Sequence, residues 1–217
     1  MKSILVTGGT GFIGSHTCLK LLEQGYYLFI MDSFVNSSPI VRERLDTIFS
    51  ERELKIEDRL SLIEGDIRDY SLLSKIFEYS SLSQKPIQAV LHFAGLKSIP
   101  ESVSNPLHYW DVNVNGSISL LRAMEQNKCR TIVFSSSATI YGSNGASPLS
   151  EDLDLKPLNP YGRTKEAVER ILHDVFISSR SKWRIANLRY FNPIGSHPSG
   201  NLGEDPMKIP TNLFPYI

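Results

Sequence analysis

The sequence predicts an α/β protein built on a doubly wound, parallel sheet of the Rossmann type. Three observations support this class. Short apolar runs alternate with amphipathic stretches, the first run leads into a glycine-rich turn, and 41% hydrophobic with 21% charged residues is typical of a globular protein. A chain of 217 residues is long enough for one such domain and the beginning of another.

Six apolar runs have the length and the boundaries of buried parallel strands. Each is bounded by turn residues or by a polar stretch, and between consecutive runs there is room for a crossover connection. In chain order, we expect strands over residues 3–6, 26–31, 60–66, 89–95, 131–137 and 184–191.

Amphipathic segments fill the gaps between these runs. Gly25 follows the first segment, as glycine often follows a helix, and Asp69 precedes the second as an expected N-cap. Residues 36–59 are charged and fit a helix followed by a loop, whereas the Gly- and Pro-rich stretch after Asn192 reads as a long functional loop. We expect the main helices over residues 12–24, 70–79, 105–126 and 161–177.

Composition and charge argue against several classes of protein. A formal net charge of zero and a near-neutral pI do not fit a nucleic-acid binder. No apolar run has the length of a membrane span, and we expect no signal peptide before the first glycines. Cys18 and Cys129 are far apart and the five histidines are scattered, so we expect no disulfide, no metal site and a cytoplasmic location.

The glycine-rich turn predicts a dinucleotide site. Gly9, Gly11 and Gly14 fit the G-x-G-x-x-G spacing, and Gly8 begins a second, three-residue repeat. Glycines here allow a tight turn, the approach of a pyrophosphate and close packing of the following helix, whose N-terminus favours phosphate. Asp32 ends the second run, where an acid would bind the adenosine ribose. Because no arginine follows it closely, NAD is favoured over NADP.

Polar residues stand at the ends of three later runs, where ligands bind in open α/β sheets. Asp66 would lie near an adenine, Lys97 near a phosphate or the nicotinamide ribose, and Ser137 beside the nicotinamide. Each of them would also fit an ordinary surface turn.

Tyr161 and Lys165 lie four residues apart at the start of a predicted helix and therefore share one face. A free tyrosine titrates near pH ~10, and adjacent positive charge lowers that pKa. We predict that Lys165 and the positive nicotinamide ring lower the pKa of Tyr161. Tyr161 would then take a proton from a substrate hydroxyl while hydride leaves the same carbon, with Ser137 relaying the proton.

Five segments together resemble the extended short-chain dehydrogenase/reductases: TGGTGFIG, HFAGLKS, SSSATIYG, YGRTK and LRYFNPIGSHPSG. Within that family they are similar to the UDP-glucose (UDP-galactose) 4-epimerases, from Met1 to Ile217. The resemblance implies tightly held NAD, a UDP-hexose substrate and transient oxidation at C4, with hydride returned to the opposite face. It implies Tyr161 as the base, Ser137 as its partner and Lys165 as the residue that binds the nicotinamide ribose.

The resemblance also implies two domains and two sets of binding residues. Residues 1–191 would form the NAD-binding domain, and residues 192–217 would begin a substrate-binding lobe that in the family extends beyond this chain. The implied substrate-binding residues are Ser137, Tyr161, Asn192, Asn212 and Leu213. The implied cofactor-binding residues are Gly8, Gly11, Phe12, Ile13, Gly14, Asp32, Asp66, Ile67, Phe93, Ala94, Gly95, Lys97, Ser137, Tyr161, Lys165 and Phe191.

Two residue patterns bear on cofactor binding and on the choice between related reactions. Val112 precedes Asn113 where the epimerases commonly have an asparagine, which puts one cofactor hydrogen bond in question. Ala138 and Thr139 follow Ser137 where sugar-nucleotide 4,6-dehydratases carry an Asp–Glu pair, which argues against dehydration. A 4-reductase and an NAD-binding module without turnover both stay open.

The resemblance further implies a homodimer formed through two long helices of each copy. Residues 105–126 and 161–177 would supply that four-helix contact. The first carries an apolar stripe and the second a similar one. Each stripe would equally fit a face that covers the sheet.

Overall fold

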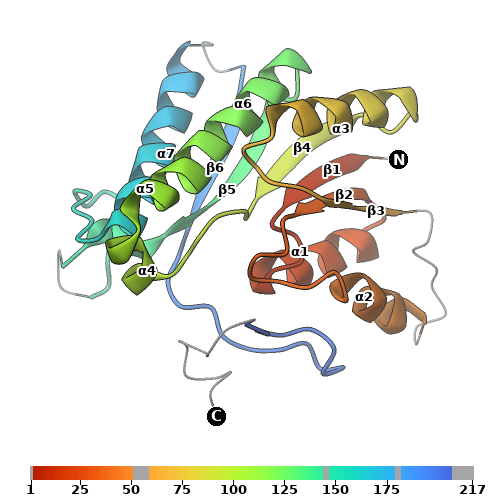
Figure 1. The fold of residues 1–217 in the computed structure, drawn as a ribbon, viewed down its shortest axis with the longest axis horizontal. Coiled ribbons are helices and arrows are strands. Elements are labelled where there is room, and N and C mark those ends of the chain that lie inside the picture. Colours follow the sequence, from red (N-terminus) through yellow and green to blue (C-terminus); the bar gives the residue numbers. More distant parts are fainter. Residues whose placement is uncertain (1, 51–58, 144–146, 179–181, 207–217) are drawn as a thin grey trace.

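The computed structural model describes residues 2–50, 59–143, 147–178 and 182–206. Six parallel strands form one sheet in the order β3-β2-β1-β4-β5-β6, which confirms the doubly wound fold class (Figure 1). The order reverses between β1 and β4, and this is the point where such sheets bind nucleotides. The strands are β1 (Ser3–Thr7), β2 (Tyr27–Asp32), β3 (Leu60–Glu64), β4 (Ile87–His92), β5 (Thr131–Ser137) and β6 (Arg184–Tyr190).

Helices cover the sheet from both sides and bury two apolar clusters. On one side, α1 and α2 pack on the strands around Val6, Leu28 and Ile30. On the other side, α3, α6 and α7 pack around Phe29, Val90 and Phe134. The helices are α1 (Phe12–Glu23), α2 (Val41–Ser50), α3 (Tyr70–Leu82), α4 (Ile99–Ser104), α5 (Pro106–Tyr109), α6 (Gly116–Gln126) and α7 (Pro160–Ser178).

Most of the expected elements are confirmed, with small changes at their ends. β5 has the predicted bounds, and the Asp69 carboxylate caps α3 by accepting from the Leu72 amide at 2.9 Å. β3 ends at Glu64 and β4 at His92, so Asp66 and Gly95 lie in loops rather than in strands. Helix α4 was not predicted. It begins at a Ser98 cap whose hydroxyl accepts from the Glu101 amide.

The prediction of one regular helix over residues 105–126 is wrong. A π-helical stretch, η1 (Trp110–Asn115), separates α5 from α6 and widens the turn. As a result the predicted stripe does not form one buried face. Leu121 is buried, but Leu107 is 81% exposed and Trp110 is 39% exposed. Asn113 points into the protein instead.

No helix within the described ranges is long and apolar enough to cross a membrane. The described residues also contain no group of three or more His, Cys, Asp or Glu side chains that could hold a metal ion.

His92 ties the sheet to α6 from a fully buried position. Its Nε2 lies 2.9 Å from the Ser117 hydroxyl, which itself donates to the Asn113 carbonyl. Ser117 must therefore accept from Nε2–H, and Nδ1 accepts from the Thr7 hydroxyl at 2.7 Å. Burial, together with the nearby charge of Lys165, lowers the pKa of His92 to about 3.

Stability should consequently fall as the pH drops from 7 to 5. The unfolded histidine binds a proton below its ordinary pKa of about 6.5, whereas the folded one stays neutral until about pH 3. Because the unfolded state binds more protons, the free energy of unfolding should decrease by about 2 kcal/mol over this interval. Urea titrations at both pH values measure the change.

The matched variants for this test are His92→Gln and His173→Gln. His92→Gln should be less stable at pH 7 but should lose most of the pH dependence between pH 7 and 5. His173 is exposed on α7, and His173→Gln should keep the wild-type dependence. An unchanged slope in His92→Gln would contradict the assignment.

Candidate active site

The glycine turn lies between β1 and α1 and touches the loop that follows β4. Gly8 has φ +70°, and a side chain there would place its Cβ 2.5 Å from the Ala94 amide nitrogen. A Cβ on Gly14 would lie 2.3 Å from the Gly8 carbonyl oxygen, so α1 packs directly on the turn. Gly11 caps α1 without a side-chain hydrogen bond, and the first turn contains no acid. The helix N-terminus is thus left for an anionic ligand, together with Phe12 and Ile13, the first residues of α1.

Asp32 ends β2 beside this turn. One carboxylate oxygen accepts from the Thr10 amide at 3.1 Å, and the other accepts from the Phe34 amide at 3.1 Å and the Ser37 hydroxyl at 3.0 Å. The carboxylate therefore holds the glycine turn and the β2–α2 loop together. Sequence reasoning found Asp32 but missed Thr10 and Ser37, which only the folded loops bring to it.

Ser137, Tyr161 and Lys165 come together at the carboxyl end of β5. Ser137 is the last residue of β5, and the phenol of Tyr161 in the first turn of α7 lies near its side chain. Lys165 lies one turn further along α7, with its Nζ 5.9 Å from the centre of the Tyr161 ring. Nζ donates to the Ser135 carbonyl at 2.8 Å, which fixes the ammonium beside the strand.

The expected lowering of the Tyr161 pKa is not produced by the protein's own groups. Burial raises the pKa of Tyr161, and the hydrogen bond from Ser137 offsets only part of that rise. The ammonium of Lys165 is directed to the Ser135 carbonyl rather than to the phenol oxygen. Burial also lowers the pKa of Lys165 to about 8, which still leaves it mostly charged at pH 7.

Asn113 supports this group from the π-helical stretch, and sequence reasoning did not identify it as a site residue. Its side-chain oxygen accepts from the Leu96 amide at 2.8 Å, while its Nδ2 donates to the Leu96 carbonyl at 3.1 Å. The same Nδ2 also donates to the Thr164 hydroxyl at 3.0 Å. Asn113 therefore joins the loop after β4 to the start of α7. π-Helical stretches often occur at functional sites, but sequence periodicity alone does not predict where they form.

The loop after β4 contains four predicted cofactor residues. Phe93 packs against the cluster under α1 and α2, and Ala94 packs against the cluster on the opposite side of the sheet. A Cβ on Gly95 would lie 3.0 Å from the Asn113 side-chain oxygen, so this backbone runs close to the Asn113 contacts. Lys97 forms an ion pair with Glu204 at 2.9 Å.

Asp66 and Ile67 follow β3 and differ in their surroundings. Asp66 binds Arg68 with both carboxylate oxygens, and these hydrogen bonds lower the pKa of Asp66. Arg68 also pairs with Asp111 at the start of η1. The Ile67 side chain is buried in the core, so only its backbone is left to meet a ligand.

The remaining predicted residues lie after β6. Tyr190 pairs with Ser137 across the two strands, so Phe191 and Asn192 emerge just beyond Ser137, and both are exposed. Asn212 and Leu213 lie outside the described residues.

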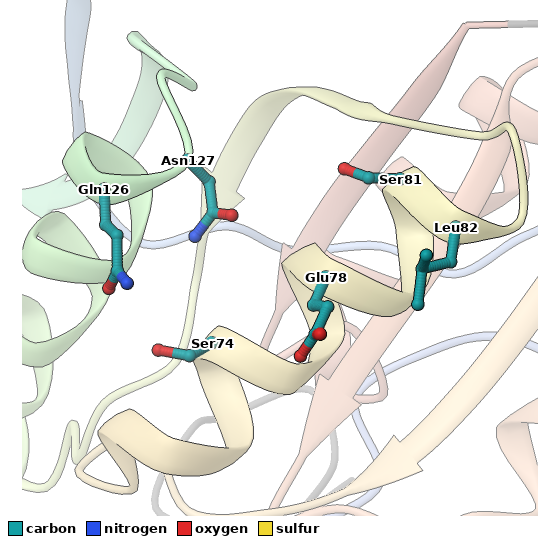
Figure 2. A pocket seen from close by; sticks show the side chains of 6 residues that line it. All are labelled: Ser74, Glu78, Ser81, Leu82, Gln126 and Asn127. Atoms are coloured by element: carbon teal, nitrogen blue, oxygen red, sulfur yellow. The ribbon is translucent and has the colours of Figure 1, made fainter.

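A separate polar pocket lies between α3 and the end of α6, as Figure 2 shows. The C-terminal ends of these helices precede β4 and β5, so the pocket lies toward the amino ends of the strands. None of the predicted site residues contributes to it. Its lining residues are Ser74, Glu78, Ser81, Leu82, Gln126 and Asn127.

Comparison with known proteins places the chain in a family. A sequence model of the family described as GDP-mannose 4,6 dehydratase matches residues 5–214. The chain is 48% identical to UDP-glucose 4-epimerase 2 of Arabidopsis thaliana over 216 residues, and 46% identical to the UDP-glucose 4-epimerase of Bacillus subtilis over 215 residues. These alignments cover 100% and 99% of this chain but only 59% and 60% of the relatives.

Solved structures of UDP-glucose 4-epimerases are also similar to this chain. The UDP-glucose 4-epimerase of Bifidobacterium longum, in complex with NAD+ and UDP, matches with a TM-score of 0.88 and 42% identity. That of Stenotrophomonas maltophila, with bound NAD and formylated UDP-arabinopyranose, matches with a TM-score of 0.89 and 42% identity. The matches cover 99% and 100% of this chain and 61% of each structure. The chain spans about three fifths of the length of these proteins, and it belongs to the GDP-mannose 4,6 dehydratase family, in which its sequence and fold are similar to those of UDP-glucose 4-epimerases.

Proposed function

We propose that this chain is the NAD-binding and proton-transferring part of a UDP-hexose 4-epimerase that interconverts UDP-glucose and UDP-galactose. The observation that carries the proposal is the group formed by Ser137, Tyr161 and Lys165 at the carboxyl end of β5. It lies on the edge of the sheet where the glycine turn and Asp32 prepare a dinucleotide site. The identities near 48% with UDP-glucose 4-epimerases support the same reading.

The residues present fit NAD. Gly8 and Gly14 sit where a Cβ would meet backbone, Gly11 leaves the start of α1 open to a pyrophosphate, and Asp32 stands where the adenosine ribose hydroxyls would bind. Ser33, Phe34 and Val35 follow Asp32 and supply no cation for a 2′-phosphate. NAD is therefore favoured over NADP. The solved relatives from Bifidobacterium longum and Stenotrophomonas maltophila contain NAD.

The protein's own residues would transfer the proton of the substrate hydroxyl. NAD, when bound, would accept hydride from C4 of the hexose and return it to the opposite face of the keto sugar. Tyr161 would take the proton of the C4 hydroxyl, and Ser137 would hydrogen-bond that hydroxyl and the phenol. Since burial raises the pKa of Tyr161, positive charge near its ring must favour the phenolate. Lys165, held by the Ser135 carbonyl, would provide part of that charge and bind the nicotinamide ribose.

The other predicted residues complete the proposal. Asp66 and the backbone of Ile67 would meet the adenine, and the loop from Phe93 to Lys97 would line the pyrophosphate and ribose. Phe191 would contact the cofactor. Asn192, Asn212 and Leu213 would contact the substrate. Residues 1–191 would form the NAD-binding domain and residues 192–217 the start of a substrate-binding lobe. The buried, free Cys18 and Cys129 fit the reducing conditions of the cytoplasm.

Two other functions share this site. A 4-reductase would use the same Ser137, Tyr161 and Lys165 but release its cofactor after each cycle. An NAD-binding module would keep the cofactor and show no turnover. A dehydratase is disfavoured although the family is described by one, because Ala138 and Thr139 start a short 3₁₀ helix after Ser137 and supply no carboxylate.

The test is to purify residues 1–217, measure retained NAD, and assay conversion of UDP-galactose to UDP-glucose. Retained NAD with conversion is the expected result. Retained NAD without conversion would favour the NAD-binding module. NAD that exchanges freely, with consumption of NADH, would favour a 4-reductase. A folded protein with neither NAD nor turnover would contradict the proposal.

We also propose that two copies associate through the helices at residues 105–126 and 161–177. Exposed apolar side chains in these two segments support it, since Leu107 and Ile177 are both at least 60% exposed. Analytical ultracentrifugation that finds only monomer at micromolar concentration would contradict the dimer.

A further inference from the structure

Residues 197–205, which we call the strap, form an ordered crossing rather than a free tail. Within the strap the His197 amide donates to the Leu202 carbonyl at 2.8 Å, and the Gly200 amide donates to the His197 carbonyl at 2.9 Å. Gly200 has φ +74°, which lets the chain turn back at that point. The strap therefore has a shape of its own although it contains no helix or strand.

The strap begins beyond β6 and reaches the opposite half of the sheet. β6 is at one edge, yet Leu202 is 1% exposed and belongs to the apolar cluster that includes Val41 and Leu45 of α2. In Figure 1 the blue segment after β6 runs past the ends of the strands toward α1 and α2. To make this connection it must pass the carboxyl ends of β4 and β1, where the strand order reverses.

Two consecutive acids then join both sides of that reversal. Glu204 pairs at 2.9 Å with Lys97, which follows β4, and Asp205 pairs at 3.0 Å with Arg44 of α2. β1 and its glycine turn lie between these two attachment points in the sheet order. Where the strap meets α2, a polar pocket remains between them, lined in part by Arg44, Gly203 and Asp205. The strap is thus anchored by one apolar side chain and closed by two ion pairs beside a water-accessible space.

We propose that the strap is a cofactor-retaining element, and that the Glu204–Lys97 and Asp205–Arg44 pairs hold it closed over the dinucleotide site. This inference rests on the proposed binding of NAD. Nucleotides bind at the carboxyl edge of the reversal point, which is the region that the strap crosses. Release of NAD requires the two ion pairs to open. The pairs act as positioning contacts, so they control the rate of release rather than the chemistry.

The test compares the rate of NAD release in wild type and in Glu204→Gln/Asp205→Asn. Each protein is loaded with a fluorescent etheno-NAD and chased with excess NAD, and the loss of bound fluorescence is followed. The double variant is expected to release the probe about tenfold faster, since partly exposed ion pairs each contribute modestly. Raising the salt concentration should accelerate release from wild type but change the double variant little, because salt screens exposed pairs.

Glu23→Gln is the matched control. It breaks the Lys20–Glu23 pair on α1, which has a similar geometry, with N and O 2.8 Å apart, but lies at the far end of that helix from the glycine turn. This variant should release the probe at the wild-type rate. Equal release rates for wild type and the double variant would overturn the strap proposal while leaving NAD binding intact. Failure of wild type to bind NAD would instead overturn the proposed function.

Discussion

Replacing Tyr161 with phenylalanine is expected to lower the kcat for UDP-galactose conversion by about 100- to 10,000-fold, the usual contribution of a positioned acid–base group. Retained NAD and the melting temperature should change little. The phenol is the group on α7 that lies near Ser137, and phenylalanine keeps the ring while removing only the oxygen that would carry the proton. Activity and NAD content are measured on the same preparations.

The physical reason lies in the partners of the phenol. Ser137 lies beside it, and the Ser137 oxygen accepts from the Thr139 amide at 3.2 Å and the Thr139 hydroxyl at 3.0 Å. Those two donors leave the Ser137 hydroxyl proton to be given to another acceptor. Ser137 can therefore pass a proton along, and of its neighbours in the described part of the chain, Thr139 and Tyr161, only Tyr161 would serve as the base. Without Tyr161 the site would lack the base that accepts the proton of the substrate hydroxyl.

Tyr27→Phe provides the control for this substitution. Tyr27 begins β2 at the opposite end of the sheet, is buried, and hydrogen-bonds to the Ser61 hydroxyl at 2.7 Å. Its variant loses one buried hydroxyl contact without touching the strand ends, so activity should stay within about twofold of wild type. If Tyr161→Phe kept activity comparable to Tyr27→Phe, another residue would have to be the base.

The fold was largely predictable because its signals are local. β5 was predicted at its observed bounds from one run of residues, and the Asp69 cap of α3 from a single side chain. The doubly wound fold class followed from the general behaviour of alternating elements. The helix over residues 105–126 was not predictable in the same way. Its π-helical stretch accompanies the burial of Asn113 against Leu96 and Thr164, and those contacts come from other parts of the chain.

In the candidate site, too, the features set by local sequence were predictable and those set by distant contacts were not. Asp32, Ser137 and Tyr161 were found because each occupies a fixed position relative to a strand or helix end. The rise that burial gives to the pKa of Tyr161 in the protein alone was not predictable, because residue spacing does not reveal burial. The strap contacts join residues that are 107 positions apart for Lys97–Glu204 and 161 apart for Arg44–Asp205, so only the folded chain reveals them.

Gly11→Ala and Gly14→Ala are expected to separate cofactor binding from folding. Among the described residues, a Cβ on Gly11 would have only the Gly8 carbonyl oxygen nearby, at 3.5 Å, which is ordinary van der Waals contact. The folded chain should therefore accept alanine there with little change in melting temperature. The added methyl group would stand at the start of α1, where the backbone must approach the pyrophosphate. We expect NAD affinity to fall by about tenfold or more, as for other small overpacking effects.

Gly14→Ala, in contrast, should lower the stability of the folded chain. Its Cβ would lie 2.3 Å from the Gly8 carbonyl oxygen and 2.8 Å from the Gly9 Cα, and both are backbone atoms that cannot rotate away. Either α1 or the turn must move, which should cost about 1–3 kcal/mol of unfolding free energy. That loss lowers the melting temperature by roughly 3–10 °C for a chain of this size. Calorimetry without added NAD measures the stability, and equilibrium titration with NAD measures the affinity.

The contrast between the two variants is what tests the glycine turn. If both lost stability equally, the turn would be a packing feature and its geometry would say little about a nucleotide. If Gly11→Ala kept both its stability and its NAD affinity, the pyrophosphate could not lie against Gly11, and the dinucleotide site would have to be placed elsewhere. Loss of NAD binding in a Gly11→Ala protein that melts like wild type would tie this turn to the cofactor independently of any assay of turnover.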